Sequence, residues 1–136
     1  MFEYKTTIRL RDTDAAGVMY FARQFELVHE AYEAFMAGLG FGLGRILRDE
    51  TWFLAIVHAE SDYLAPLRVG DQIRISLGIE RLGKSSYTIR YELSKDGKRS
   101  VGTARTVHVA VSRKMRRKLS LPRALAGKLA QCRIAK

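Results

Sequence analysis

The sequence predicts an α+β protein in which an antiparallel sheet curls around one long helix. A single long helical pattern covers residues 21–37 and is apolar over most of its circumference. Four strand-like segments then follow one another with no helix between them. Because helices and strands do not alternate, we do not expect a parallel sheet. A meander of strands buries one apolar helix by wrapping around it.

The first third of the chain contains one strand, one loop and the long helix. Alternating residues predict a strand over 3–11, and turn-forming residues fill 12–20. The helix over 21–37 has a narrow polar stripe and ends before Gly38. The stripe consists of Glu26, His29, Glu30 and Glu33. The glycine-rich segment 38–44 is expected to be a mobile loop. It is not a phosphate-binding loop, because it follows a helix and has no Gly-Lys-Ser/Thr ending.

The rest of the chain predicts four strands and a short helix. The strands cover residues 53–64, 73–80, 87–94 and 99–111. Gly83 with Lys84 marks one turn, and Asp96-Gly97 is a strong hairpin signal. A basic run follows the last strand over residues 113–118. Ser120 and Pro122 then open a terminal helix that continues to Ala130.

Length and composition indicate one globular domain over residues 1–136. The chain has 24 basic and 14 acidic residues, a formal net charge of +10, which should attract polyanions. Nucleic acid, an anionic membrane and a phosphate-bearing ligand all fit that charge. Cys132 is the single cysteine, which fits a reducing compartment. We also see no secretory leader and no membrane-length apolar run, so we expect a cytoplasmic protein without membrane insertion.

An Asp-x-Asp motif, Asp12 to Asp14, lies just before the predicted helix. Helix starts offer free backbone N–H groups and a positive dipole end, which can stabilise a developing oxyanion. A carboxylate opposite them could attack a carbonyl carbon or activate water. The alternative interpretation is an acidic turn that only caps the helix.

The segment over residues 12–36 resembles the active-site stretch of the 4-hydroxybenzoyl-CoA thioesterase family, which has the hotdog fold. The pattern is Asp-x-Asp, small residues with Gly, two apolar residues and the aromatic pair Tyr20-Phe21. The strand order resembles the family over nearly the whole chain. Within the family, the sequence is most similar to 1,4-dihydroxy-2-naphthoyl-CoA thioesterases of quinone biosynthesis.

The resemblance implies roles for individual residues. Asp14 would be the nucleophile or general base, and the backbone N–H of Phe21 the oxyanion donor. Asp12 would be structural, paired with Arg9 or Arg11. The family places a CoA-contacting lysine just after the third-strand turn, which matches Lys84.

His58 and Glu60 share one face of a predicted strand and match half of a zinc deaminase motif. The required Pro-Cys-x-x-Cys half is absent, and no third ligand is evident. We therefore expect no metal. Two interpretations of His58 stay open, a hydrogen bond to a hydroxylated acyl group or a hydrogen bond at an interface. Likewise, His29-Glu30-x-x-Glu33 lacks the second histidine of a zinc protease and is expected to be the polar stripe.

The basic run suggests a clamp for the phosphates of CoA, with Arg113 among its candidates. The alternative is a solvated tail beside the last strand. Tyr20 is expected to contact the acyl group, together with other aromatic side chains near the catalytic loop. The alternative is that these aromatic side chains only fill the core.

We therefore expect an acyl-CoA thioesterase acting on an aromatic acyl-CoA, with no cofactor beyond the CoA of the substrate. Two alternatives are a short- or medium-chain acyl-CoA or acyl-carrier-protein thioesterase, and a basic nucleic-acid-binding module. We expect no nucleic acid partner, because the aromatic residues fall at core-periodic positions. One curled sheet leaves an open edge, and the resemblance implies an active site between subunits, so we expect a homodimer or homotetramer.

Overall fold

The computed structural model describes residues 1–134 and contains one sheet, three α-helices and a 3₁₀ turn. The strands are β1 (Phe2–Thr7), β2 (Trp52–Tyr63), β3 (Gln72–Leu82), β4 (Ser86–Lys95) and β5 (Arg99–Ser112). The helices are α1 (Arg23–Gly38), α2 (Leu43–Asp49) and α3 (Arg123–Ala130), and η1 covers Leu10–Asp12.

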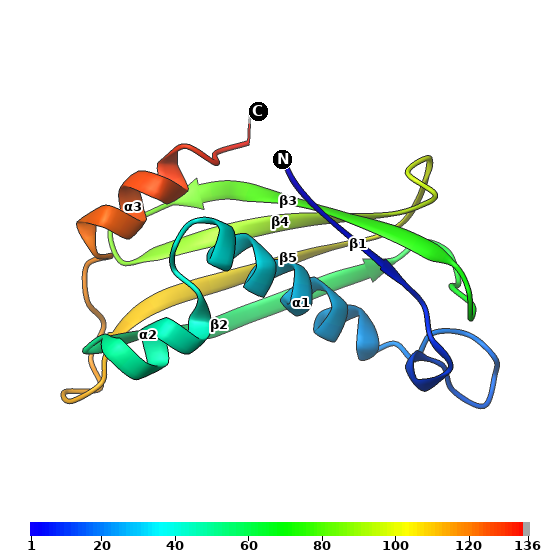
Figure 1. The fold of residues 1–136 in the computed structure, drawn as a ribbon, viewed down its shortest axis with the longest axis horizontal. Helices are drawn as coiled ribbons and strands as arrows, with labels where there is room; N and C mark the ends of the chain where they lie inside the picture. Colours follow the sequence, from blue (N-terminus) through cyan, green and yellow to red (C-terminus); the bar gives the residue numbers. More distant parts are fainter. Residues whose placement is uncertain (135–136) are drawn as a thin grey trace.

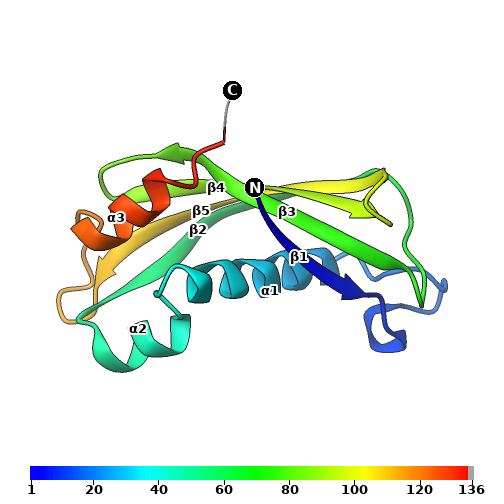
Figure 2. The same ribbon diagram turned by 45° about the horizontal axis from the view of Figure 1, so that its top comes forward.

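All neighbouring strands are antiparallel, in the order β1-β3-β4-β5-β2. The sheet curves over α1, which crosses its concave face (Figures 1 and 2). β1 and β2 are therefore the two edges of the sheet. The predicted architecture, an antiparallel sheet curled around one long helix, is confirmed.

The hydrophobic core lies between α1 and the sheet. The buried face of α1 consists of Leu27, Val28, Ala31, Tyr32, Phe35 and Met36. The predicted polar stripe is half-buried or exposed on the other side of the helix. The helix begins at Arg23 instead of residue 21, because residues 20–22 form a turn in which the Arg23 N–H donates to the carbonyl of Tyr20 (2.9 Å).

Two further predictions of local structure were wrong. The strand predicted over 3–11 ends at Thr7, and η1 follows it. The segment 38–44 was expected to be a mobile loop, but α2 begins within it, at Leu43. Ile46 is only 2% exposed and anchors this short helix in the core. Tertiary burial of Ile46 outweighs the low helix propensity of the neighbouring glycines.

The Asp96-Gly97 hairpin is confirmed. Both residues have positive φ, 53° and 70°, and the Lys98 N–H donates to the carbonyl of Lys95 (3.0 Å). These are the features of a type I′ turn, which suits the twist of the two flanking strands. Among residues 1–134, no helix is long and apolar enough to cross a membrane.

Candidate active site

The loop that carries Asp14 is closed on itself by backbone hydrogen bonds. The Asp14 N–H donates to Val18 and the Gly17 N–H donates to Asp14, both at 3.0 Å. Gly17 has φ 81°, a conformation that favours glycine. The Ala16 N–H donates to Oδ1 of Asp14 (2.9 Å). The side chain is exposed, and its Oδ2 atom has no hydrogen-bond partner within residues 1–134. One carboxylate oxygen is thus held while the other remains available.

Asp12 differs from Asp14 because it is buried and fully bonded. It is 2% exposed, and its Oδ1 accepts a hydrogen bond of 2.8 Å from Nε of Arg23. Its Oδ2 accepts the backbone N–H of Arg9 (2.8 Å). The expected structural role agrees with this geometry, but the ion-pair partner predicted as Arg9 or Arg11 is Arg23. η1 turns the Asp12 side chain inward, toward the first turn of α1.

Phe21 lies at the turn before α1, with a free backbone donor. Its N–H makes no backbone hydrogen bond within residues 1–134. Its carbonyl accepts hydrogen bonds from the Gln24 N–H (3.3 Å) and from the hydroxyl of Tyr63 (2.7 Å). The free N–H at the positive end of α1 is a suitable donor to an oxyanion.

Two residues that the sequence interpretation missed fix this turn against the end of β2. Tyr63 bonds to Phe21, and Gln24 donates through Nε2 to Oγ of Ser61 (2.6 Å) and to the carbonyl of Asp62 (3.0 Å). Gln24 is only 1% exposed. Gln24 lies three and four residues before Leu27 and Val28, so its place on the apolar face of the helix was the available signal.

The aromatic pair is exposed at the same loop. Tyr20 is 46% exposed and Phe21 61%, and their ring centroids are 4.9 Å apart. A neighbouring cavity of about 360 Å³ extends from Phe21 to Tyr63 and Leu64. The structure therefore brings Asp14, Tyr20 and Phe21 together on one loop, with apolar surface beside them.

His58 lies in the middle of β2, exposed, in a chain of charged groups. Its Nε2 is 3.3 Å from Oε2 of Glu60, and Glu60 also contacts Arg105 (3.1 Å). The hydrogen bond with His58 and then that with Arg105 lower the pKa of Glu60. No group of three or more metal-ligating side chains occurs within residues 1–134. The absence of a metal from the reaction stays a prediction.

Lys84 and Arg113 lie far from Asp14 within one chain. The Arg113 N–H bonds to the carbonyl of Thr51 (3.0 Å), and its guanidinium donates to the carbonyl of Leu47 in α2. Lys84 lies just before β4, and the carbonyl of the next residue, Ser85, accepts the N–H of Ala110 near the end of β5 (3.0 Å). Because the end of β5 pairs with the start of β2, both cations lie near that end of β2, whereas the loop that carries Asp14 lies at its other end (Figure 1). Twelve residues of strand span about 40 Å. One chain alone does not combine these cations with Asp14.

The residues Arg113 to Lys118 form an ordered turn that we call the basic hairpin. The Ser112 N–H donates to Arg117 (2.8 Å) and the Arg116 N–H to Ser112 (2.9 Å). Within residues 1–134, none of its cations pairs with a carboxylate. The basic hairpin is thus free to bind an anion.

A second cavity, of about 460 Å³, lies between α1 and β2, and we call it the α1–β2 cavity. Its helix wall carries the polar stripe and Arg23, and Ile56 and Ala59 line it from β2. Tyr91 and Thr106 line it from the sheet. Because Arg23 also holds Asp12, the cavity adjoins a residue that supports the loop carrying Asp14.

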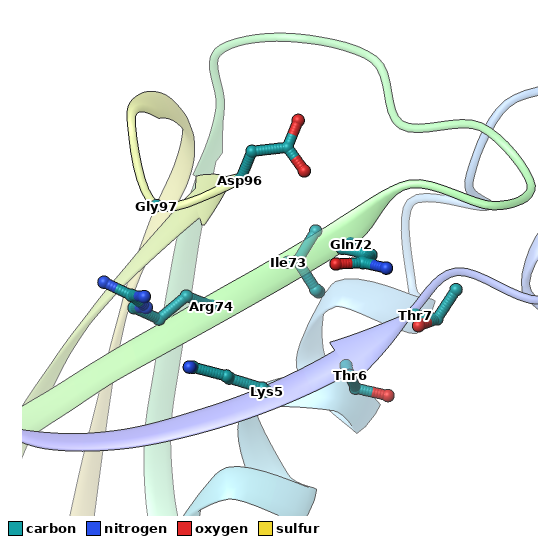
Figure 3. A pocket seen from close by; sticks show the side chains of 8 residues that line it. All are labelled: Lys5, Thr6, Thr7, Gln72, Ile73, Arg74, Asp96 and Gly97. Atoms are coloured by element: carbon teal, nitrogen blue, oxygen red, sulfur yellow. The ribbon is translucent and has the colours of Figure 1, made fainter.

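A third cavity, of about 470 Å³, lies at the opposite edge of the sheet, between β1, β3 and the turn at Gly97 (Figure 3). Arg74 extends toward Gly97 and Lys5 runs in the same direction, while the carboxylate of Asp96 points away from both. None of the predicted site residues lines this cavity.

Comparison with known proteins gives one consistent family. The model of the Thioesterase-like superfamily matches residues 8–129. The 1,4-dihydroxy-2-naphthoyl-CoA hydrolase of Synechococcus elongatus is 40% identical over 125 residues, 91% of each chain. That of Picosynechococcus is 40% identical over 126 residues, 89% of this chain and 86% of the relative.

Solved structures agree with the sequence comparison. The crystal structure of a 1,4-dihydroxy-2-naphthoyl-CoA thioesterase from Synechocystis superposes with a TM-score of 0.89 at 31% identity, over 95% of both chains. The hotdog fold predicted from the sequence is thereby confirmed. The match to the family model, the identity to these hydrolases and the shared fold together show that the chain belongs to the Thioesterase-like superfamily.

Proposed function

We propose that the protein hydrolyses an aromatic acyl-CoA, with 1,4-dihydroxy-2-naphthoyl-CoA as its substrate, to the free acid and CoA. One observation carries the chemistry: an exposed carboxylate with a free oxygen, Asp14, shares a loop with the free N–H of Phe21 at the start of α1. The identity of the acyl group is proposed from the names of the relatives at 40% identity.

In the proposed reaction each group performs one step. The Phe21 N–H bonds to the carbonyl oxygen of the thioester and stabilises the negative charge that develops there. Asp14 either attacks the carbonyl carbon or removes a proton from an attacking water. The tetrahedral intermediate collapses, the carbon–sulfur bond breaks, and CoA leaves as a thiolate that takes up a proton. In the nucleophilic route, water then hydrolyses the acyl-aspartyl anhydride.

We propose a second copy of the chain as the partner that completes the site. β2 is a 12-residue edge strand, with Ile56 45% and Val57 60% exposed near its middle. Such an edge pairs readily with another strand. A two-fold axis at the strand centre would place the start of the partner's β2 opposite Tyr63. The basic hairpin of the partner would then approach Asp14, and its cations would contact the phosphates of CoA.

The alternative function, a module that binds nucleic acid on a face of its sheet, has less support. Such modules stack bases on exposed aromatic side chains. The aromatic residues of β4, Tyr87 and Tyr91, are each 1% exposed and belong to the core. The free thiol of Cys132 fits a cytoplasmic location, which we propose as well.

A substrate panel tests the proposed function. Purified protein is assayed against aryl, short-chain and long-chain acyl-CoA thioesters and an acyl-carrier-protein thioester, with a thiol reagent as readout. We expect the highest kcat/KM for 1,4-dihydroxy-2-naphthoyl-CoA, and no loss of activity after dialysis against a chelator. A clear preference for straight-chain thioesters would refute the aryl assignment and leave the thioesterase assignment in place. Asp14→Asn is the inactive control.

A further inference from the structure

A chain of three buried polar groups crosses the core beneath the α1–β2 cavity. The hydroxyl groups of Tyr91 and Thr106 are 2.9 Å apart, and the Thr106 hydroxyl is 2.7 Å from Nε2 of His108. The three residues are 1%, 5% and 1% exposed. Buried polar groups cost free energy unless they are bonded. The hydrolytic steps described above use none of them.

His108 holds this chain in a fixed orientation. Its ring stacks between Tyr32 (centroids 4.3 Å apart) and Tyr87 (5.0 Å apart, planes 7° apart). Burial, and to a smaller extent the charge of His29, lowers the pKa of His108 to about 3. The imidazole is therefore neutral at pH 7, with one donor and one acceptor nitrogen.

Counting the donors and acceptors in this chain leaves one unused hydrogen-bonding position on the Tyr91 hydroxyl. If Nε2 of His108 accepts, Thr106 donates to it, Tyr91 donates to Thr106, and a lone pair of the Tyr91 oxygen remains. If Nε2 carries the proton, the bonds run the other way and the Tyr91 proton remains. In either tautomer Tyr91 ends the chain with one unused hydrogen-bonding position. A hydroxyl group, which both donates and accepts, fits both cases.

Tyr91 and Thr106, the two hydroxyl-bearing members of the chain, line the α1–β2 cavity. Apolar side chains from both walls, Val28 and Ile56 among them, also line the cavity, and Glu30 and Glu33 stand at its helix wall. A flat apolar ring with an outward hydroxyl matches that lining, and a straight alkyl chain leaves the polar position unfilled.

We propose that the α1–β2 cavity receives the acyl ring of the substrate and that Tyr91 determines specificity by bonding to a ring hydroxyl. Thr106 and His108 are positioning residues that fix the direction of the Tyr91 hydroxyl. The inference rests on the proposed function and adds to it the group that recognises a hydroxylated aromatic acid.

The test compares kcat/KM for 1,4-dihydroxy-2-naphthoyl-CoA with that for 2-naphthoyl-CoA, which lacks both hydroxyl groups. In Tyr91→Phe we expect this ratio to fall about 10- to 100-fold, the scale for losing a hydrogen bond to a buried partner. Tyr87→Phe is the matched control. Tyr87 lies on the same strand, is equally buried and bonds to Tyr32 (2.7 Å), but it does not line the cavity. Its loss should leave the ratio unchanged.

Thr106→Val, which keeps the shape but removes the middle hydroxyl, decides the question if Tyr91→Phe does not fold. We expect it to lower the same ratio by a smaller factor. An unchanged ratio in the folded variants, or an equal fall in Tyr87→Phe, would overturn the assignment of Tyr91 while the thioesterase activity stands. A wild-type protein that cleaves neither ester would overturn the proposed function itself.

Discussion

The hydroxyl group of Tyr63, at the end of β2, donates a 2.7 Å hydrogen bond to the carbonyl oxygen of Phe21, whose own N–H is free. The bond fixes the peptide group that follows Phe21 without occupying the N–H that precedes it. The end of an edge strand thus sets the direction of the proposed oxyanion donor.

We predict that Tyr63→Phe lowers kcat about tenfold, the scale of one lost hydrogen bond, because the turn before α1 loosens. KM for the acyl-CoA should change little, because the Tyr63 hydroxyl bonds to the turn before α1 and is not one of the cations proposed to bind the phosphates. Steady-state kinetics together with a thermal melt check this. A lower melting temperature with unchanged kcat would mean that the bond is only structural.

Substitution of the two aspartates should affect different properties, catalysis at Asp14 and stability at Asp12. Asp14→Asn should reduce kcat by about two to four orders of magnitude, the scale of a lost acid–base or nucleophilic group, and should fold normally. Asp12→Asn should instead lower the free energy of unfolding by about 1–3 kcal/mol, because it weakens a buried, bonded partner of Arg23. Urea unfolding and initial rates on both variants provide the measurement. If Asp14→Asn mainly lowered stability and Asp12→Asn mainly lowered kcat, the roles of the two aspartates would be reversed.

Mixed oligomers test whether the site uses two chains. One variant carries Asp14→Asn, and the other carries Lys114→Ala, Arg117→Ala and Lys118→Ala, which should raise KM. Arg113 is kept, because it also holds α2. After unfolding and refolding as a mixture, about one quarter of the sites should combine an intact Asp14 with an intact basic hairpin of the other chain. Activity at low substrate concentration should therefore return. If each site used residues of one chain only, mixing the two variants would restore no activity.

Stability should fall in mild acid because of His108. Its pKa in the folded protein is about 3, against 6.5 when it is free, so the unfolded chain binds a proton between these values and the folded chain does not. The free energy of unfolding should decrease by roughly 1.4 kcal/mol per pH unit as pH falls through that window. Denaturant titrations at pH 7 and pH 5 measure it. His108→Gln is the control, and an equal decrease in that variant would exclude His108 as the cause.

The sequence predicted the architecture well where burial follows a regular period. The apolar positions of α1 repeat with the helical period and are the residues that pack on the sheet. β5 shows the limit of this reasoning. Val107, Val109 and Val111 mark it as a strand, yet its buried face carries Thr106 and His108. Alternation predicts a strand but not which face is inward when polar groups are bonded in the core.

For the predicted site residues, too, local sequence was sufficient for some and insufficient for others. Asp14, Tyr20 and Phe21 are neighbours in sequence and lie on one loop, so local pattern was sufficient to group them. Lys84 and Arg113 depend on tertiary position, and one chain alone does not bring them to Asp14. The partner of Asp12 was assigned to nearby arginines, whereas η1 directs its carboxylate across to Arg23.

The polar stripe of α1 has a consequence for how a thioester would be oriented. The protein carries a net charge of +10, yet Glu30 and Glu33 line the α1–β2 cavity while the unpaired cations of the basic hairpin lie outside it. A CoA thioester is strongly anionic at its nucleotide end and uncharged at its acyl ring. Carboxylates at the cavity wall repel the phosphates and the outer cations attract them. If the α1–β2 cavity receives the acyl ring as proposed, the substrate would enter ring first, and after cleavage the same repulsion would keep the nucleotide of free CoA out of the cavity.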